Sequence, residues 1–255
     1  MSGFVSKVRK PKAREVVMVA LLSALTVVGN LMSVSVLPIQ AGTGMVIVSG
    51  VAFGPGVGFL VGALGRFINN FFQGQGSWTI WQMMTWGLLG ALSGVVFNKV
   101  DLDKPKSRDF KVVLGPVVFV LLAELLAYLS YVIFPMGETT FWGWRLYAFG
   151  VAGLLLGMML QRKQLPIDDI TLSVFTFLVV FIIYGGIMNI AALFTGAVIS
   201  GDVSLEALKG LYITGAPFDL WHSVRTTIFV FLFGEKLIRK LERVKIKYGF
   251  YRIRK

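Results

Sequence analysis

Long apolar stretches alternate with short polar or basic segments along this chain. Six stretches approach or exceed the roughly 20 residues that a helix needs to cross the hydrocarbon core of a membrane. They lack the alternation of barrel strands, and a backbone in lipid must satisfy its own hydrogen bonds, which favours helices. The pattern predicts an all-α integral membrane protein, a helical bundle whose six full spans are Val16 to Leu37, Trp78 to Val96, Val112 to Phe134, Trp142 to Leu160, Ile170 to Ile199 and Phe218 to Phe233.

A further apolar segment between the first two spans is interrupted by Gly54, Pro55 and Gly56. Proline lacks an amide donor and disfavours helix in the residue before it, so one helix should end here and another begin. We therefore expect a short helix pair in addition to the six spans, and six to eight crossings in total.

Composition and charge agree with a membrane protein. The chain has 56% hydrophobic and 15% charged residues and a mean hydropathy of +0.76, whereas soluble domains carry about 25% charged residues. The net charge is +12, and 21 of the 25 Lys and Arg fall in four clusters, within 7–14, 99–111, 162–163 and 236–255. By the positive-inside rule these clusters are cytoplasmic, which predicts that both termini are cytoplasmic and that nucleic acid is not the partner. We expect the first span to be retained, and residues 1–255 to form a single domain.

Aromatic and amide side chains gather in the segments predicted to face outward. Tryptophan and tyrosine often form an interfacial belt, but amides interleaved with aromatics suit a pocket that stacks a ring system and hydrogen-bonds neutral polar groups. The predicted substrate-binding residues are Asn69, Asn70, Phe71, Phe72, Gln73, Gln75, Trp78, Trp81, Trp142, Trp144, Tyr147, Phe218 and Trp221.

A few charged residues fall within the predicted spans, where charge is costly and usually faces the bundle interior. Glu124 is expected to be either paired or protonated, with Arg145 or Arg225 as a candidate partner, and Asp219, His222 and Arg225 are spaced to share a helix face. A structural ion-pair network is the favoured interpretation, and an intramembrane enzyme using Asp219 and His222 is the alternative. One histidine and no cysteine cannot build a usual zinc site, so we expect no metal site and no catalytic residue.

Small residues are spaced for close helix packing in two places. Ala20 and Ala24 lie one turn apart on the first span, and Gly87, Gly90, Ala91 and Gly94 lie on one side of the span from Trp78 to Val96. Such spacing lets another helix approach closely, either within the bundle or from a partner.

Four segments resemble the substrate-binding S components of energy-coupling factor (ECF) vitamin transporters. They are ALLSA after a basic start, AFGPGVGFLVGALGRF, WTIWQMMTWGLLGALSG, and GAPFDLWHSV before a basic C-terminus. The resemblance implies a six-helix core in a cell membrane, with no enzymatic activity of its own. It also implies a transmembrane coupling protein and two ATPase subunits as partners, and a docking role for Ala20 and Ala24.

The resemblance further implies a vitamin as the transported substrate and no intrinsic cofactor. The neutral, aromatic-rich outer segments favour cobalamin or a related corrinoid. Folate, with Arg66 and Arg145 for its carboxylates, and riboflavin remain alternatives. A stand-alone secondary transporter, with the break at Gly54 to Gly56 at its midplane, is a third functional class.

Overall fold

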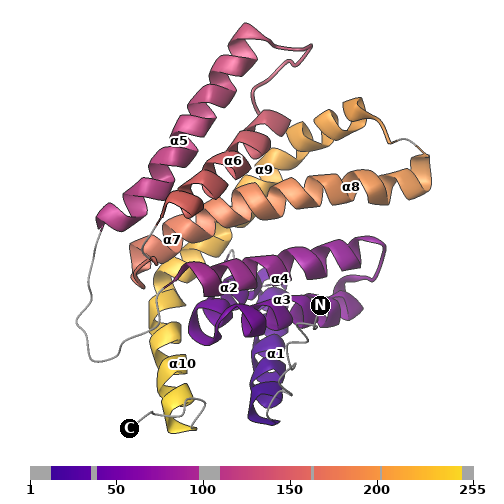
Figure 1. Ribbon diagram of the computed structural model, residues 1–255. Coiled ribbons are helices and arrows are strands. Elements are labelled where there is room, and N and C mark those ends of the chain that lie inside the picture. Colours follow the sequence, from indigo (N-terminus) through magenta and orange to yellow (C-terminus); the bar gives the residue numbers. More distant parts are fainter. Residues whose placement is uncertain (1–12, 36–38, 98–109, 162–163, 202, 249–255) are drawn as a thin grey trace, which may run out of the picture.

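The computed structural model describes residues 13–35, 39–97, 110–161, 164–201 and 203–248. These residues are almost entirely helical (Figure 1), with one isolated bridge between Phe97 and Leu165. The helices are α1 (Ala13–Ser35), α2 (Ala41–Phe53), α3 (Pro55–Gln73), α4 (Trp78–Val96), α5 (Phe110–Ile133), α6 (Trp144–Leu160), α7 (Asp169–Leu178), the π-helical segment η1 (Val179–Tyr184), α8 (Gly185–Ser200), α9 (Leu205–Phe229), the π-helical segment η2 (Val230–Gly234) and α10 (Glu235–Lys247).

The helical class is as predicted, and helices form at the six predicted spans and at the short pair. In the described residues, three helical segments are both long and apolar enough to cross a membrane: Ala13–Ser33, Leu114–Ile133 and Asp169–Gly196. Six full spans and the side of the membrane on which the termini lie stay predictions. The start of α1 and the end of α10 lie together, because the Arg14 Nη1 donates to the backbone oxygen of Tyr248 at 2.8 Å.

The predicted break after α2 is confirmed. Gly54 has φ of 91°, a conformation that L side chains rarely adopt, and Pro55 opens α3, where its missing amide donor costs nothing. The last predicted span differs, because its helix begins at Leu205 rather than near Phe218. Ser204 caps that helix by accepting from the amide of Ala207 at 3.1 Å, and the less apolar turns that follow hid this start from the hydropathy pattern.

Glycines bring α2, α3 and α4 into backbone contact. A β-carbon on Gly50 would lie 2.0 Å from the carbonyl oxygen of Gly90, and one on Gly94 would lie 2.4 Å from the nitrogen of Pro55. Small residues allow this approach in lipid, where no hydrophobic effect drives helices together. The glycine row on α4 therefore serves packing inside the bundle.

Helix α5 packs mainly against α6, and Figure 1 shows it on the outer side of that helix. Close approach again depends on glycine, since a β-carbon on Gly153 would lie 2.8 Å from Cα of Val120. Helix α6 in turn contacts η1, α8 and α9, so the α5–α6 hairpin is attached to the rest of the bundle through α6.

Candidate functional site

A network of amide side chains surrounds Arg66 where α3 ends and α4 begins. Helical spacing puts the contributing positions of α3 on one face, because residues three, four and seven apart are neighbours on a helix. This end of the bundle is opposite to the one where Arg14 meets Tyr248. We call the network the Arg66 cluster; its members are Asn30, Arg66, Asn69, Asn70, Gln73, Gln82 and Trp86.

Two glutamine oxygens hold the guanidinium in place. Arg66 Nε donates to Gln82 Oε1 at 2.9 Å and Arg66 Nη1 donates to Gln73 Oε1 at 3.2 Å. The centre of the guanidinium lies 5.1 Å from the ring centroid of Trp86, within the range of a cation–π interaction. These neutral partners leave the positive charge of Arg66 uncancelled within the cluster.

Asparagines complete the cluster. Asn69 Nδ2 donates to Gln73 Oε1 at 2.6 Å, and Asn70 Nδ2 donates to Gln82 Oε1 at 2.8 Å. Both asparagines are buried, and the Oδ1 atom of each lacks a hydrogen-bond partner among the described residues. Buried polar atoms are normally hydrogen-bonded, so two unpaired acceptors beside a cation are what a polar ligand or water would satisfy.

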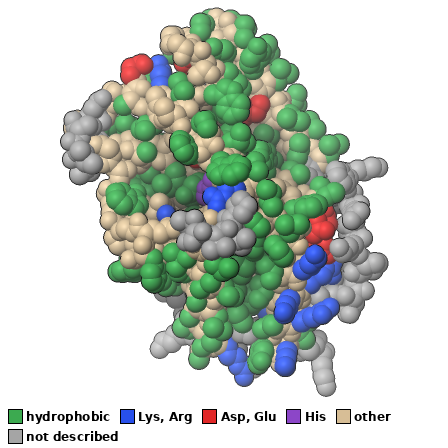
Figure 2. Space-filling view, turned by 180° about the vertical axis from the view of Figure 1, so that it is seen from behind, with side chains coloured by type: hydrophobic (Ala, Val, Ile, Leu, Met, Phe, Trp, Pro, Cys, Tyr) green, Lys and Arg blue, Asp and Glu red, His purple; other side chains and the backbone are tan. Residues whose placement is uncertain are grey.

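Side chains from α2, η1 and α9 extend this polar region. Thr43 Oγ1 lies 3.0 Å from His222 Nε2, and the rings of His222 and Tyr184 meet edge to face at 4.6 Å. Arg66 is within electrostatic reach of both Tyr184 and His222. Figure 2 shows the histidine beside Lys or Arg atoms in a hollow of the surface.

The predicted substrate-binding residues divide into separate places. Asn69, Asn70 and Gln73 belong to the Arg66 cluster, and Gln75 lies beside it, where its Oε1 accepts from Thr79 at 2.9 Å. Trp81 stacks on Phe194 of α8 at 5.8 Å. The side chains of six other predicted residues are exposed: Phe71, Phe72, Trp78, Trp142, Phe218 and Trp221.

Trp144 and Tyr147 lie on α6 and line a different cavity, bounded by α4, α6, α8 and α9. The predicted substrate-binding residues do not include Asn30, Gln82 and Trp86, and Arg66 was named only as a possible partner for folate. Positions 66, 69, 70 and 73 place polar side chains on one face of an otherwise apolar helix. This pattern was the sequence feature that could have identified the group.

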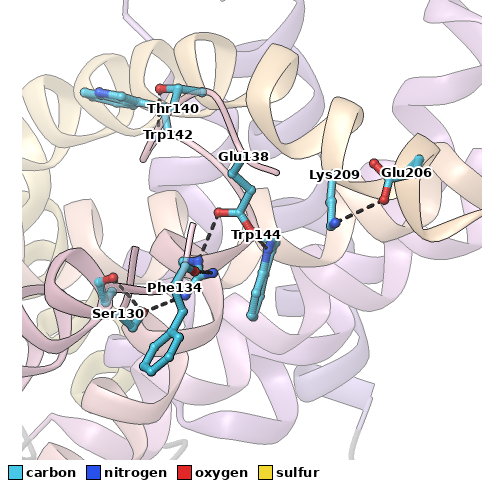
Figure 3. Close-up of polar contacts among 10 residues, drawn as sticks. Ser130, Phe134, Glu138, Thr140, Trp142, Trp144, Glu206 and Lys209 are labelled. Atoms are coloured by element: carbon cyan, nitrogen blue, oxygen red, sulfur yellow. Dashed lines mark hydrogen bonds and ion pairs between the residues drawn. The ribbon is translucent and has the colours of Figure 1, made fainter. Parts of the chain in front are cut away.

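Arg145, one of the two candidate partners of Glu124, pairs with Glu138 instead. Arg145 is buried and donates from Nε to Glu138 Oε2 at 2.9 Å, from Nη1 to Ser130 Oγ at 2.8 Å and from Nη2 to the carbonyl of Phe134 at 2.6 Å (Figure 3). Glu138 follows α5 directly and reaches the start of α6, whereas Glu124 lies lower on α5 against Gly150. The carboxylate that pairs with Arg145 thus comes from the loop between α5 and α6. Glu138 Oε1 also accepts from Trp144 Nε1 at 2.7 Å.

Asp219 and His222 do not share a site. Asp219 Oδ2 accepts from Tyr147 Oη at 2.6 Å and from Asn189 Nδ2 at 2.8 Å, while His222 contacts Thr43 of α2. An arrangement in which Asp219 orients His222 as a general base is therefore absent. Among the described residues there is also no group of three His, Cys, Asp or Glu side chains that would hold a metal ion.

The first helix exposes the residues predicted to dock a partner. Ala20 and Ala24 are both exposed, and they lie among exposed Leu21, Leu25 and Val28 on the same side of α1. The other side of the helix is buried through Leu22 and Ser23. This apolar face is available to a second transmembrane protein.

Comparison with known proteins identifies the N-terminal half. Residues 10–127 match a family model described as ECF-type riboflavin transporter, S component. A UPF0397 protein of Aliivibrio fischeri strain MJ11 is 30% identical over 121 residues, which are 44% of this chain and 62% of that protein. A UPF0397 protein of Vibrio atlanticus strain LGP32 is 31% identical over 121 residues, with the same shares. This chain thus spans 62% of the length of the curated relatives that it matches, and no solved structure matches it.

The matched region contains α1 to α4, and with them the whole Arg66 cluster and the exposed alanines of α1. The family model describes a membrane transporter component, and the helices Ala13–Ser33, Leu114–Ile133 and Asp169–Gly196 suit a protein that crosses the membrane several times. Residues 10–127 of this chain are thus similar to the S components of ECF-type transporters.

Proposed function

We propose that this chain is the vitamin-binding subunit of an ATP-driven ECF importer and that the Arg66 cluster contacts the vitamin. The single observation that carries the proposal is that two buried amide oxygens of the cluster, Oδ1 of Asn69 and Oδ1 of Asn70, have no hydrogen-bond partner among the residues that the structure describes. A ligand with both donors and acceptors would complete this network.

Riboflavin is the first substrate to test. The matching family model carries its name, and a flavin offers ring nitrogens, carbonyls and ribityl hydroxyls to neutral amides and one arginine. Cobalamin, which the amide-rich outer segments favour, is the second, because its many side-chain amides suit the same partners. The carboxylates of folate need cationic partners. Arg145 already pairs with Glu138, so Arg66 is the remaining candidate.

Equilibrium binding to the purified full chain tests the proposal. Riboflavin, cobalamin and folate are titrated separately, with fluorescence quenching or absorbance as the readout. We expect one of them to bind with a dissociation constant in the nanomolar range that is typical of high-affinity capture. Failure of every vitamin to bind a monodisperse, helical preparation overturns the proposal.

The energy source belongs to the same proposal. The exposed Ala20 and Ala24 face supports docking of a transmembrane coupling protein that carries two ATPase subunits. In liposomes, the chain alone should bind the vitamin without accumulating it. Accumulation of the vitamin by the isolated chain without ATP would favour a stand-alone secondary transporter instead.

A further inference from the structure

The α5–α6 hairpin leaves a cavity between itself and the rest of the bundle. The cavity has a volume of about 610 Å³ and is bounded by Leu88 and Leu92 on α4, Val151 on α6 and Ile187 on α8. Its walls are almost wholly apolar. The two tyrosine hydroxyls near it are used elsewhere, because Tyr147 donates to Asp219 and Tyr212 donates to the carbonyl of Gly186 at 3.1 Å.

An apolar wall of this kind does not suit a vitamin with many polar groups, since each buried polar group without a partner is costly. It also does not suit another helix. A helix about 10 Å across and 20 Å long fills roughly 1,600 Å³, well above the volume of this cavity. A flexible hydrocarbon chain is the remaining class of occupant.

The depth of the cavity fits one leaflet. Its lining on α6 runs from Trp144 to Met158, which is about 21 Å along the helix. A bilayer is about 40–45 Å thick with its headgroups, so this length matches half of it. Trp144 marks the end that belongs at the interface, where tryptophan is enriched.

Opposite charges stand together at that end. Lys209 lines the cavity, and its Nζ donates to Glu206 Oε1 at 3.0 Å; the Glu206 side chain is 81% exposed. Figure 3 shows Lys209 and Glu206 beside Trp144, which lines the same cavity as Lys209. An exposed ion pair contributes little by itself and exchanges partners readily. A headgroup that carries both a phosphate and an ammonium can satisfy Lys209 and Glu206 at once.

We propose that a phospholipid of the phosphoethanolamine class occupies this cavity, with one acyl chain between α4 and α6, its phosphate at Lys209 and its ammonium at Glu206. The lipid fills the space that the hairpin leaves and so stabilises the attachment of α5 and α6 to the bundle. This site is separate from the Arg66 cluster, and the proposal does not depend on which vitamin the chain binds.

Native mass spectrometry of the purified full chain tests the proposal. The protein is first delipidated in detergent and then offered phosphatidylethanolamine, phosphatidylglycerol or phosphatidylcholine. We expect one retained ethanolamine lipid per chain, preferred over the glycerol lipid about fivefold, the size of an exposed ion-pair effect. Ile187→Trp, which fills the cavity, should abolish retention, while Leu122→Trp on the exposed side of α5 should not.

Two further variants keep the test decisive. Ala148→Leu narrows the same cavity with a smaller change and serves if Ile187→Trp fails to fold. Lys209→Glu should remove the headgroup preference without emptying the cavity. Retention that is equal in the filled variants and the wild type shows annular lipid only and overturns the proposal, as does the absence of any headgroup preference in the wild type.

Discussion

Gly58 of α3 and Gly90 of α4 pack backbone against backbone, so that a β-carbon on Gly90 would lie 2.2 Å from the carbonyl oxygen of Gly58. This contact holds the α3–α4 pair in the register that brings Gln73 and Gln82 to opposite sides of Arg66. The site thus depends on packing about two helical turns away from it.

Gly90→Ala should lower the melting temperature of the purified protein. The new methyl group meets backbone, which cannot move aside as a side chain can, and overpacking of this kind costs about 1–3 kcal/mol. Gly210→Ala is the matched control, because nothing lies within 4 Å of a β-carbon there. Equal melting temperatures for the two variants would contradict the close α3–α4 packing.

Gln82→Leu should weaken vitamin binding by at least about tenfold. The substitution removes the acceptor that Arg66 Nε and Asn70 share, and hydrogen bonds to charged groups contribute about 1.5–3 kcal/mol. Gln164→Leu, at the other end of the bundle, changes the same residue type and should leave the dissociation constant unchanged. Titration of the vitamin against both variants measures the difference.

Arg145→Met should destabilise the α5–α6 hairpin strongly. Removing one member of a buried ion pair leaves the other charge unpaired and costs about 3–5 kcal/mol. The double variant with Glu138→Met should recover most of the loss, because no buried charge then remains. The melting temperatures of the single and double variants measure the difference. A double variant no more stable than the single variant would argue against this ion pair.

Tyr147→Phe should destabilise the protein by about 1–3 kcal/mol, because Asp219 is buried and loses one of its two side-chain donors. Tyr128→Phe, on the exposed side of α5, should have little effect. Both are measured by thermal unfolding in the same detergent.

Ala20→Trp should separate coupling from binding. A large side chain on the exposed face of α1 blocks close approach of another helix but lies outside the Arg66 cluster. We expect an unchanged vitamin dissociation constant, with loss of copurifying partner proteins and of uptake in cells. Leu122→Trp, on the exposed side of α5, is the control for a bulky lipid-facing residue. Intact uptake in the Ala20 variant would contradict docking at this face.

Much of the candidate site was readable from α3 alone. The amides at Asn69, Asn70 and Gln73 share a helix face, and that face became one wall of the Arg66 cluster. Trp142, Phe218 and Trp221 were also predicted to bind the substrate, yet their side chains are exposed. An aromatic at a helix end suits a belt and a pocket equally well, and only the rotation of its helix decides between them.

The sequence by itself determined the membrane class, the helical segments and the break at Gly54, because hydropathy and backbone restrictions act within a single segment. Only the tertiary structure decided that Arg145 pairs with Glu138 rather than Glu124, and that Asp219 and His222 face different partners. It also decided that the glycines of α4 meet α3, and that α4, α6, α8 and α9 line a cavity. The choice of partner depends on the depth and rotation of each helix against its neighbours, which long-range packing fixes and local sequence does not.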